Sequence, residues 1–198
     1  MTGVQTCALP ILSDGAFDFL VASGSLPPGA PDNLYARMAN RVPSGTKFVL
    51  DTSGAELETA LGAGGLFLVK PSKGELEQLA GRRLASREEI ADCARELINH
   101  GGAKRMVVTC GRDGAIMADI GGAWYLPAVP VQTRSTVGAG DSFLAGMIYG
   151  FATGQDPSDC FRFGAACGAA SALSPGTGLA HPDDARRLLE NIALPLRI

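Results

Sequence analysis

The stretch Ser135–Phe143, STVGAGDSF, carries the strongest structural signal in the sequence. Three small residues, Gly138, Ala139 and Gly140, precede a largely apolar segment that we expect to be helical to about residue 152. The first N–H groups of a helix have no partner inside the helix, and the helix dipole adds partial positive charge there. The stretch therefore predicts a loop that enters a helix and forms an anion site suited to a phosphate.

Asp141 lies in the same turn, where a carboxylate would repel a bound phosphate. Its presence is explained if it accepts a proton from an attacking hydroxyl while the backbone amides stabilise the phosphoryl group in transfer. The alternative is that Asp141 is only an acidic residue in the first turn of a helix, where acids are favoured. For this motif taken alone, the alternative is the preferred interpretation.

Short apolar segments alternate with helical segments along the rest of the chain. We expect strands over residues 17–23, 47–51, 66–70, 105–110, 115–119 and 124–126, and helices over 31–42, 55–61, 72–79, 86–100, 138–152, from 157 and from 182. This alternation is typical of an α/β fold with a mostly parallel sheet. In such folds ligands bind beyond the carboxyl ends of the strands, so the loops that follow strands are the expected binding segments.

Composition narrows the class of protein further. The 198 residues are 46% hydrophobic and 19% charged, which argues against disorder, and the formal net charge is −3. This balance gives no electrostatic reason to expect a nucleic-acid or membrane partner, and no apolar run approaches the roughly 18 residues that span a bilayer. Five cysteines without a CxxC pair do not indicate a disulfide framework or a zinc site. We expect a cytoplasmic protein.

Four motifs together resemble the ribokinase-like pfkB carbohydrate kinases, and residues from about 17 to 191 follow the order of that family's C-terminal two-thirds. They are SGSLPPG at 23–29, KPSKGEL at 70–76, TCGRDG at 109–114 and STVGAGD at 135–141. The first and last are most similar to the subgroup that phosphorylates hexose phosphates, which includes 6-phosphofructokinases, 1-phosphofructokinases and tagatose-6-phosphate kinases. The resemblance implies a ribokinase-like three-layer α/β sandwich with a mostly parallel sheet.

The resemblance also implies an activity and assigns roles to matching residues. The activity would be phosphoryl transfer from ATP, as its Mg²⁺ complex, to a sugar-phosphate hydroxyl, first of all fructose 6-phosphate. Asp141 would be the catalytic base, and Gly138, Ala139 and Gly140 the anion hole. The remaining assignments are Lys70, Ser72, Thr109, Gly111, Gly114 and Thr136 for the nucleotide; Ser23, Ser25 and Asp141 for the sugar phosphate; Glu75 for Mg²⁺ through water; and Ser135, Val137, Ser174 and Gly176 for K⁺.

Several of these residues also have simpler structural interpretations. Ser72 and Glu75 fit a helix capping box, and 111–114 fits a hairpin turn. Lys70 is of a type usually solvated at the end of a strand, and Ser23 and Ser25 could be hydrogen bonders within a loop. The small residues 168–171 would allow close helix packing, or a helix surface that faces adenine.

The sequence departs from the family in two respects. Ser72 stands where the family usually has Asn, and a hydroxyl cannot reproduce both the carbonyl and the NH₂ of an amide, so contacts to Mg²⁺ and nucleotide would change. The family's Gly-Gly-Asn loop and lid are not recognised, and residues 1–11 do not resemble the family. We expect residues 1–11 to be non-native or disordered, and 12–198 to be a partial kinase domain that is inactive alone.

Other functions remain open at this point. One is an inactive nucleotide-binding fragment, and another is a kinase for fructose 1-phosphate or tagatose 6-phosphate. A dinucleotide-binding oxidoreductase ranks far below, because no GxGxxG follows an early strand. The resemblance also implies homodimers for full-length relatives.

Overall fold

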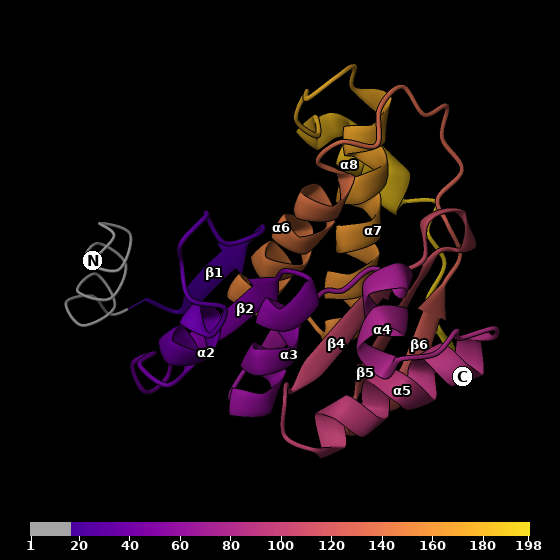
Figure 1. Cartoon of the computed structure of the whole chain (residues 1–198). Coiled ribbons are helices and arrows are strands. Elements are labelled where there is room, and N and C mark those ends of the chain that lie inside the picture. Colours follow the sequence, from indigo (N-terminus) through magenta and orange to yellow (C-terminus); the bar gives the residue numbers. More distant parts are fainter. Residues whose placement is uncertain (1–16) are drawn as a thin grey trace. The chain divides into compact units, whose positions relative to one another are not determined.

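The computed structural model describes residues 17–198, so the expectation for residues 1–11 lies outside the described part of the protein. Within it, seven strands form a mixed, mostly parallel sheet in the order β1 to β7, which confirms the α/β class (Figure 1). The strands are β1 Phe19–Ser23, β2 Lys47–Asp51, β3 Leu68–Val69, β4 Arg105–Thr109, β5 Ala115–Asp119, β6 Gly122–Leu126 and β7 Leu196–Arg197. The helices are α2 Leu34–Ala39, α3 Gly54–Ala63, α4 Lys73–Ala80, α5 Arg87–Asn99, α6 Ala139–Ala152, α7 Pro157–Leu173 and α8 Pro182–Leu189.

The chain divides into two compact units, and each is described by itself. The first contains the described residues up to Val108 together with Met117–Ala123. The second contains Thr109–Ile116 and Trp124–Ile198.

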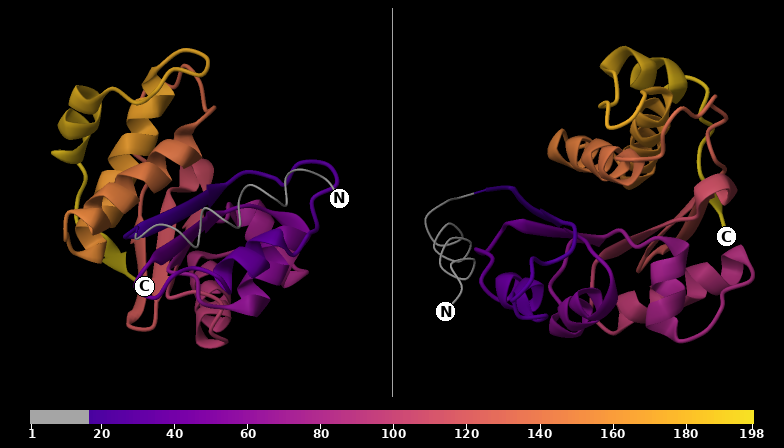
Figure 2. Two further views of the ribbon diagram at one scale, coloured as in Figure 1. Left: turned by 90° about the vertical axis from the view of Figure 1, so that its left-hand side faces the viewer. Right: turned by 45° about the horizontal axis from the view of Figure 1, so that its top comes forward.

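Parallel strands form the sheet of the first unit. β1 pairs with β2, β2 with β3 and β3 with β4, all in parallel. The three central residues of β2 and of β4 are buried, as expected of parallel strands covered on both faces. The right-hand view of Figure 2 shows α2 and α3 on one side of strands β1 and β2.

β1 differs from the expected buried strand. Only Ala22 is buried, and Val21 is 45% exposed. The reason is its place at the end of the strand order, with β2 as its one strand neighbour among the described residues. The apolar residues of β1 therefore indicate a preference for the strand conformation and do not indicate burial on both faces.

Helix boundaries in the first unit follow the side-chain signals of the sequence. Ser72 caps α4 in a complete capping box with Glu75. Ser86 caps α5 by accepting a hydrogen bond from Glu89 N, whereas the Glu89 carboxylate accepts from Ala85 N at 2.7 Å and not from Ser86 N, so the motif SREE at 86–89 does not form a reciprocal capping box. α5 ends at Asn99, with His100 as the C-cap residue and Gly101 after it at φ +84°, close to the predicted end at residue 100.

Helices α6 and α7 form the centre of the second unit and lie side by side in both views of Figure 2. Glycines bring them together. A Cβ atom on Gly146 of α6 would lie 2.8 Å from Cys167 Sγ, and one on Gly164 of α7 would lie 2.6 Å from Met147 Cγ. Each helix therefore receives a larger side chain of its neighbour at a position without a side chain. Beside them, β6 pairs with β7 in the antiparallel direction.

Candidate active site

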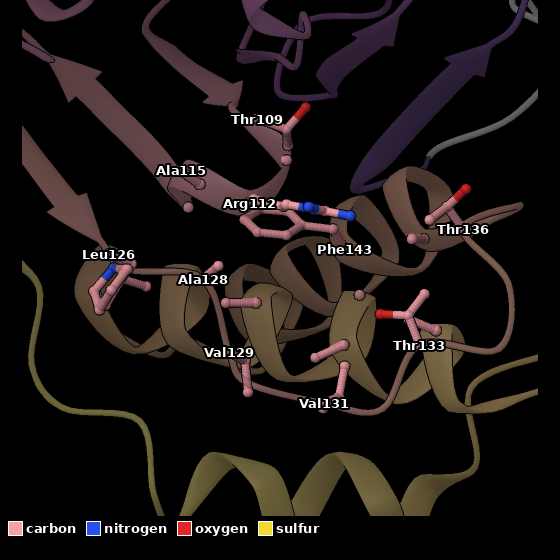
Figure 3. Close-up of a pocket in the computed structure, with 18 of the residues that line it drawn as sticks. Thr109, Arg112, Ala115, Leu126, Ala128, Val129, Val131, Thr133, Thr136 and Phe143 are labelled. Atoms are coloured by element: carbon pink, nitrogen blue, oxygen red, sulfur yellow. The ribbon is translucent and has the colours of Figure 1, made fainter. Parts of the chain in front are cut away.

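A pocket of about 850 Å³ lies entirely within the second unit (Figure 3). Its volume falls in the range of small-molecule sites, roughly 300–1,000 Å³. Four segments line it: the end of β4 with the turn that follows, the chain after β6, the start of α6 and the small-residue face of α7. Of the residues assigned from the sequence, the pocket brings together Thr109, Gly111, Gly114, Thr136, Ala139 and Gly140.

One wall depends on a close approach of backbone to backbone at Gly114. This residue has φ +90° and ψ −140°, and a Cβ atom there would lie 2.0 Å from the carbonyl oxygen of Leu126. Cys110 N donates to Gly114 O at 2.8 Å, which closes the turn. Within this turn, residues 111–113 form a short 3₁₀ helix. Only glycine fits this position, because both the conformation and the space exclude a side chain.

The chain after β6 forms a second, mostly apolar wall. Figure 3 shows Ala128, Val129 and Val131 along this segment, which continues to Thr133 and Thr136. The sequence gives no motif for this wall, because its residues are ordinary small and branched apolar types. It is a part of the site that sequence reasoning missed.

The turn that opens α6 has the predicted conformation. Gly138 is the N-cap residue at φ +76°, where a residue with a side chain would be strained, and its carbonyl accepts from Ser142 N at 2.9 Å. Ala139 N donates to Thr136 O at 3.3 Å. Among the described residues, the Gly138 and Gly140 N–H groups have no such partner. Asp141 follows in the first helical turn with its side chain exposed.

The small face of α7 both packs against α6 and lines the pocket. A Cβ atom on Gly168 would lie 3.1 Å from Ala139 O, so this glycine permits close packing against α6. Gly168, Ala165, Ala169 and Ala172 also line the pocket. Close helix packing and a flat pocket wall therefore come from the same residues.

The residues assigned to K⁺ lie on two segments that backbone hydrogen bonds connect. Arg134 N and Ser135 N donate to Ala172 O, at 2.8 and 3.4 Å, so the chain before α6 is joined to the last turn of α7. Ser174 follows that turn, and its Oγ donates to Leu179 O at 2.9 Å.

Lys70 and Asp51 form an ion pair in the first unit. The Lys70 ammonium lies 2.9 Å from Asp51 Oδ2, and the two side chains are 7% and 16% exposed. The simple interpretation of Lys70 as a solvated lysine is therefore wrong. Sequence reasoning did not single out Asp51, although it stands at the carboxyl end of a strand, where the rule for parallel sheets places ligands.

Ser72 and Glu75 bond to one another at the start of α4. Ser72 N donates to Glu75 Oε2 at 2.7 Å, and Glu75 N donates to Ser72 Oγ at 3.3 Å. The capping interpretation is confirmed. The carboxylate keeps a second oxygen, so capping leaves it able to accept a hydrogen bond from a water on Mg²⁺.

Ser23, the last residue of β1, and Ser25, in the loop that follows, are both exposed. Between them, Gly24 has φ +97° and accepts hydrogen bonds through its carbonyl from Tyr35 Oη at 2.9 Å and Thr52 Oγ1 at 3.0 Å. Burial, with a smaller contribution from Glu56, raises the pKa of Tyr35, so this phenol keeps its donor proton at neutral pH.

Residues 17–198 contain no helix long and apolar enough to cross a membrane. The same residues contain no group of three or more His, Cys, Asp or Glu side chains able to hold a metal ion.

The fold and the pocket define an α/β protein with a small-molecule site beside a helix N-terminus. The family model of the pfkB carbohydrate kinases matches residues 13–184, and the chain belongs to this family. The ATP-dependent 6-phosphofructokinase isozyme 2 of Escherichia coli is 38% identical over 170 residues, which are 85% of this chain and 55% of that protein. The 1-phosphofructokinase of Borreliella burgdorferi is 36% identical over 155 residues, 78% of this chain and 50% of that protein.

Solved structures agree with the fold. Phosphofructokinase-2 from Escherichia coli in complex with potassium superimposes with a TM-score of 0.83 at 36% identity, covering 87% of this chain and 56% of that one. Ribokinase from Arabidopsis thaliana, with ribose and ATP, gives a TM-score of 0.76 at 22% identity, over 96% and 60% of the two chains. The ribokinase-like fold is therefore confirmed. The chain spans about half the length of the curated relatives that it matches.

Proposed function

We propose that this chain carries the nucleotide-binding and phosphoryl-transfer residues of an ATP-dependent kinase for phosphorylated hexoses. The observation that carries the proposal is the GAGD turn at the rim of the pocket in the second unit. A flat, apolar pocket suits a nucleobase, and a glycine-rich helix start suits phosphate. Family membership adds the expectation that both belong to one reaction.

In this proposal Asp141 accepts the proton of the attacking sugar hydroxyl. Its exposed position in the first turn of α6 gives a substrate access to the carboxylate. The Gly138 and Gly140 amides stabilise negative charge on the phosphoryl group. Lys70 and Ser72 are assigned to the nucleotide phosphates, and Glu75 to a water on Mg²⁺, which when bound supplies charge neutralisation on the phosphates.

Fructose 6-phosphate is the proposed acceptor, and the reaction would form fructose 1,6-bisphosphate. Two relatives support a phosphohexose: the 6-phosphofructokinase isozyme 2 at 38% identity and the 1-phosphofructokinase at 36%. Fructose 1-phosphate and tagatose 6-phosphate are the other acceptors to test. Ser23 and Ser25 are the proposed sugar-phosphate contacts of this chain, and K⁺ is the proposed ion for Ser135, Val137, Ser174 and Gly176.

The test incubates the chain with MgATP, K⁺ and each sugar phosphate, and measures both nucleotide affinity and bisphosphate product. Asp141→Asn is compared with Asp156→Asn, which changes an exposed acid at the start of α7. Product that is lost only in Asp141→Asn supports the kinase assignment. Saturable MgATP binding without product assigns the chain to nucleotide binding alone, and absence of MgATP binding refutes the proposal.

A further inference from the structure

Two consecutive residues at the end of β2, Asp51 and Thr52, contact the residues that follow both neighbouring strands of the first unit. Both form hydrogen bonds with Gly24, after β1, and Asp51 also forms an ion pair with Lys70, after β3. Asp51 lies opposite Ser23 in the parallel register, and Gly24 N donates to Asp51 O at 2.9 Å. Thr52 Oγ1 donates to Gly24 O at 3.0 Å. On the other side, the Asp51 carboxylate lies 2.9 Å from the Lys70 ammonium. The pair 51–52 therefore connects the loop after β1 to the residue after β3.

Hydrogen bonds hold the peptide groups on both sides of Gly24, and its carbonyl accepts from Tyr35 Oη as well as from Thr52 Oγ1. Its φ of +97° is open to glycine, and a Cβ atom there would meet nothing within 4 Å. Glycine is thus required by conformation and not by crowding. Because hydrogen bonds hold both the N–H and the carbonyl of Gly24, they also fix the backbone on either side of it, at Ser23 and Ser25.

The Lys70–Asp51 pair is a poor device for stability alone. Removing two charges from water carries a desolvation cost that can exceed their attraction, and apolar replacements are often neutral or stabilising. Lys70 is 6% exposed as a residue and stands just beyond β3, at the ligand-binding edge of a parallel sheet. A buried, paired ammonium at such an edge is better explained by the need to hold one charge in a fixed place.

We propose that Asp51 and Thr52 are positioning residues: Asp51 orients the Lys70 ammonium toward nucleotide phosphates, and Thr52 holds the Ser23–Ser25 loop for the sugar phosphate. The inference rests on the proposed function, which assigns those ligands to Lys70 and to the two serines. It predicts that Asp51 affects phosphate recognition without touching the nucleotide.

The main test measures dissociation constants of ATP and of adenosine for the full chain and for Asp51→Asn. We expect ATP affinity to fall about tenfold, the size of one weakened charge-assisted hydrogen bond, and adenosine affinity to stay within about twofold. A general structural defect would weaken both ligands alike. An unchanged ratio of the two affinities overturns the role of Asp51.

A double-mutant cycle with Lys70→Gln tests whether Asp51 influences ATP affinity through Lys70. If Asp51 acts through Lys70, Asp51→Asn costs no further ATP affinity once Lys70 is neutral. If Asp51→Asn alone fails to fold, the double variant can still be compared with Lys70→Gln, because it leaves no unpaired ammonium. Additive losses in the cycle would refute the coupling.

The Thr52 contact has its own measurement, which needs no ligand. Thr52→Val should speed hydrogen exchange at the Gly24 amide, whereas Thr59→Val, which removes the hydrogen bonds of Thr59 Oγ1 to Asp32 O and Glu56 O, should not. Unchanged protection of Gly24 would show that Thr52 does not hold the loop. If the unsubstituted chain binds neither ATP nor adenosine, the proposed function itself is refuted. That outcome differs from an unchanged affinity ratio in Asp51→Asn and from unchanged Gly24 protection in Thr52→Val.

Discussion

Replacement of Gly114 by alanine should damage the pocket more than any change of similar size elsewhere in the second unit. The new Cβ atom would lie 2.0 Å from Leu126 O and 2.9 Å from Ala128 N, and both atoms belong to backbone. The conformation at φ +90° and ψ −140° costs a residue with a side chain about 1–3 kcal/mol. Forcing the two walls apart costs about 1–3 kcal/mol more.

Together these costs amount to about 2–6 kcal/mol. For a protein of this size each kcal/mol lowers Tm by about 2–4 °C, so we expect a loss of about 4–24 °C in a thermal melt followed by circular dichroism. MgATP affinity should fall as well, because Leu126 and Ala128 line the pocket beside Gly114.

Gly154→Ala is the matched control. Gly154 also has a positive φ, +76°, but a Cβ atom there would meet nothing within 4 Å. Only the conformational cost of about 1–2 kcal/mol applies, and MgATP affinity should not change. If the two variants lose the same Tm, the close approach at Gly114 does not contribute to stability and the reasoning fails.

Three further predictions follow from particular contacts. Ser72→Asn should tighten MgATP binding, measured by calorimetry across Mg²⁺ concentrations, while Tm stays unchanged because Asn is also a good N-cap; equal affinities would make the substitution neutral. Gly164→Ala should lower Tm, since its Cβ atom would lie 2.9 Å from Phe143 O. Its control, Gly62→Ala, changes an exposed helical position with open space around it and should stabilise the protein by about 0.5–1 kcal/mol. Tm shifts of the same sign in the two variants would contradict this prediction. Burial raises the pKa of Cys167 to about 11, so its alkylation rate should still rise between pH 9 and 11. Over the same range the alkylation rate of an ordinary thiol, with a pKa near 8.5, levels off. An alkylation rate at Cys167 that is already constant above pH 9 would contradict this prediction.

The sequence predicted most elements because their signals are local. Ser72 and Ser86 begin helices through their own side chains, and prolines stand at the first positions of α7 and α8. Gly138 and Gly114 likewise indicate turns in which a positive φ is required. The sequence alone therefore locates the glycine turn that opens α6 and the loop before β5.

The parts that sequence reasoning missed depend on pairing between distant residues. β7 has two exposed residues and no periodicity, and it exists through its pairing with Trp124 and Tyr125. The Lys70–Asp51 ion pair requires the parallel register of β2 and β3, which no short motif encodes. Residues 126–131 form a pocket wall only because Gly114 lets the two segments approach.

The exchange of glycines and larger residues between α6 and α7 also constrains how this protein can evolve. Gly146 accommodates Cys167, Gly150 accommodates Cys160, and in return Gly164 accommodates Met147. A larger residue at any of these glycines would need a smaller one opposite, so viable substitutions should arise as compensated pairs. In an alignment of homologues the two helices would then covary in side-chain volume, with the summed volume at each crossing conserved more strictly than either residue.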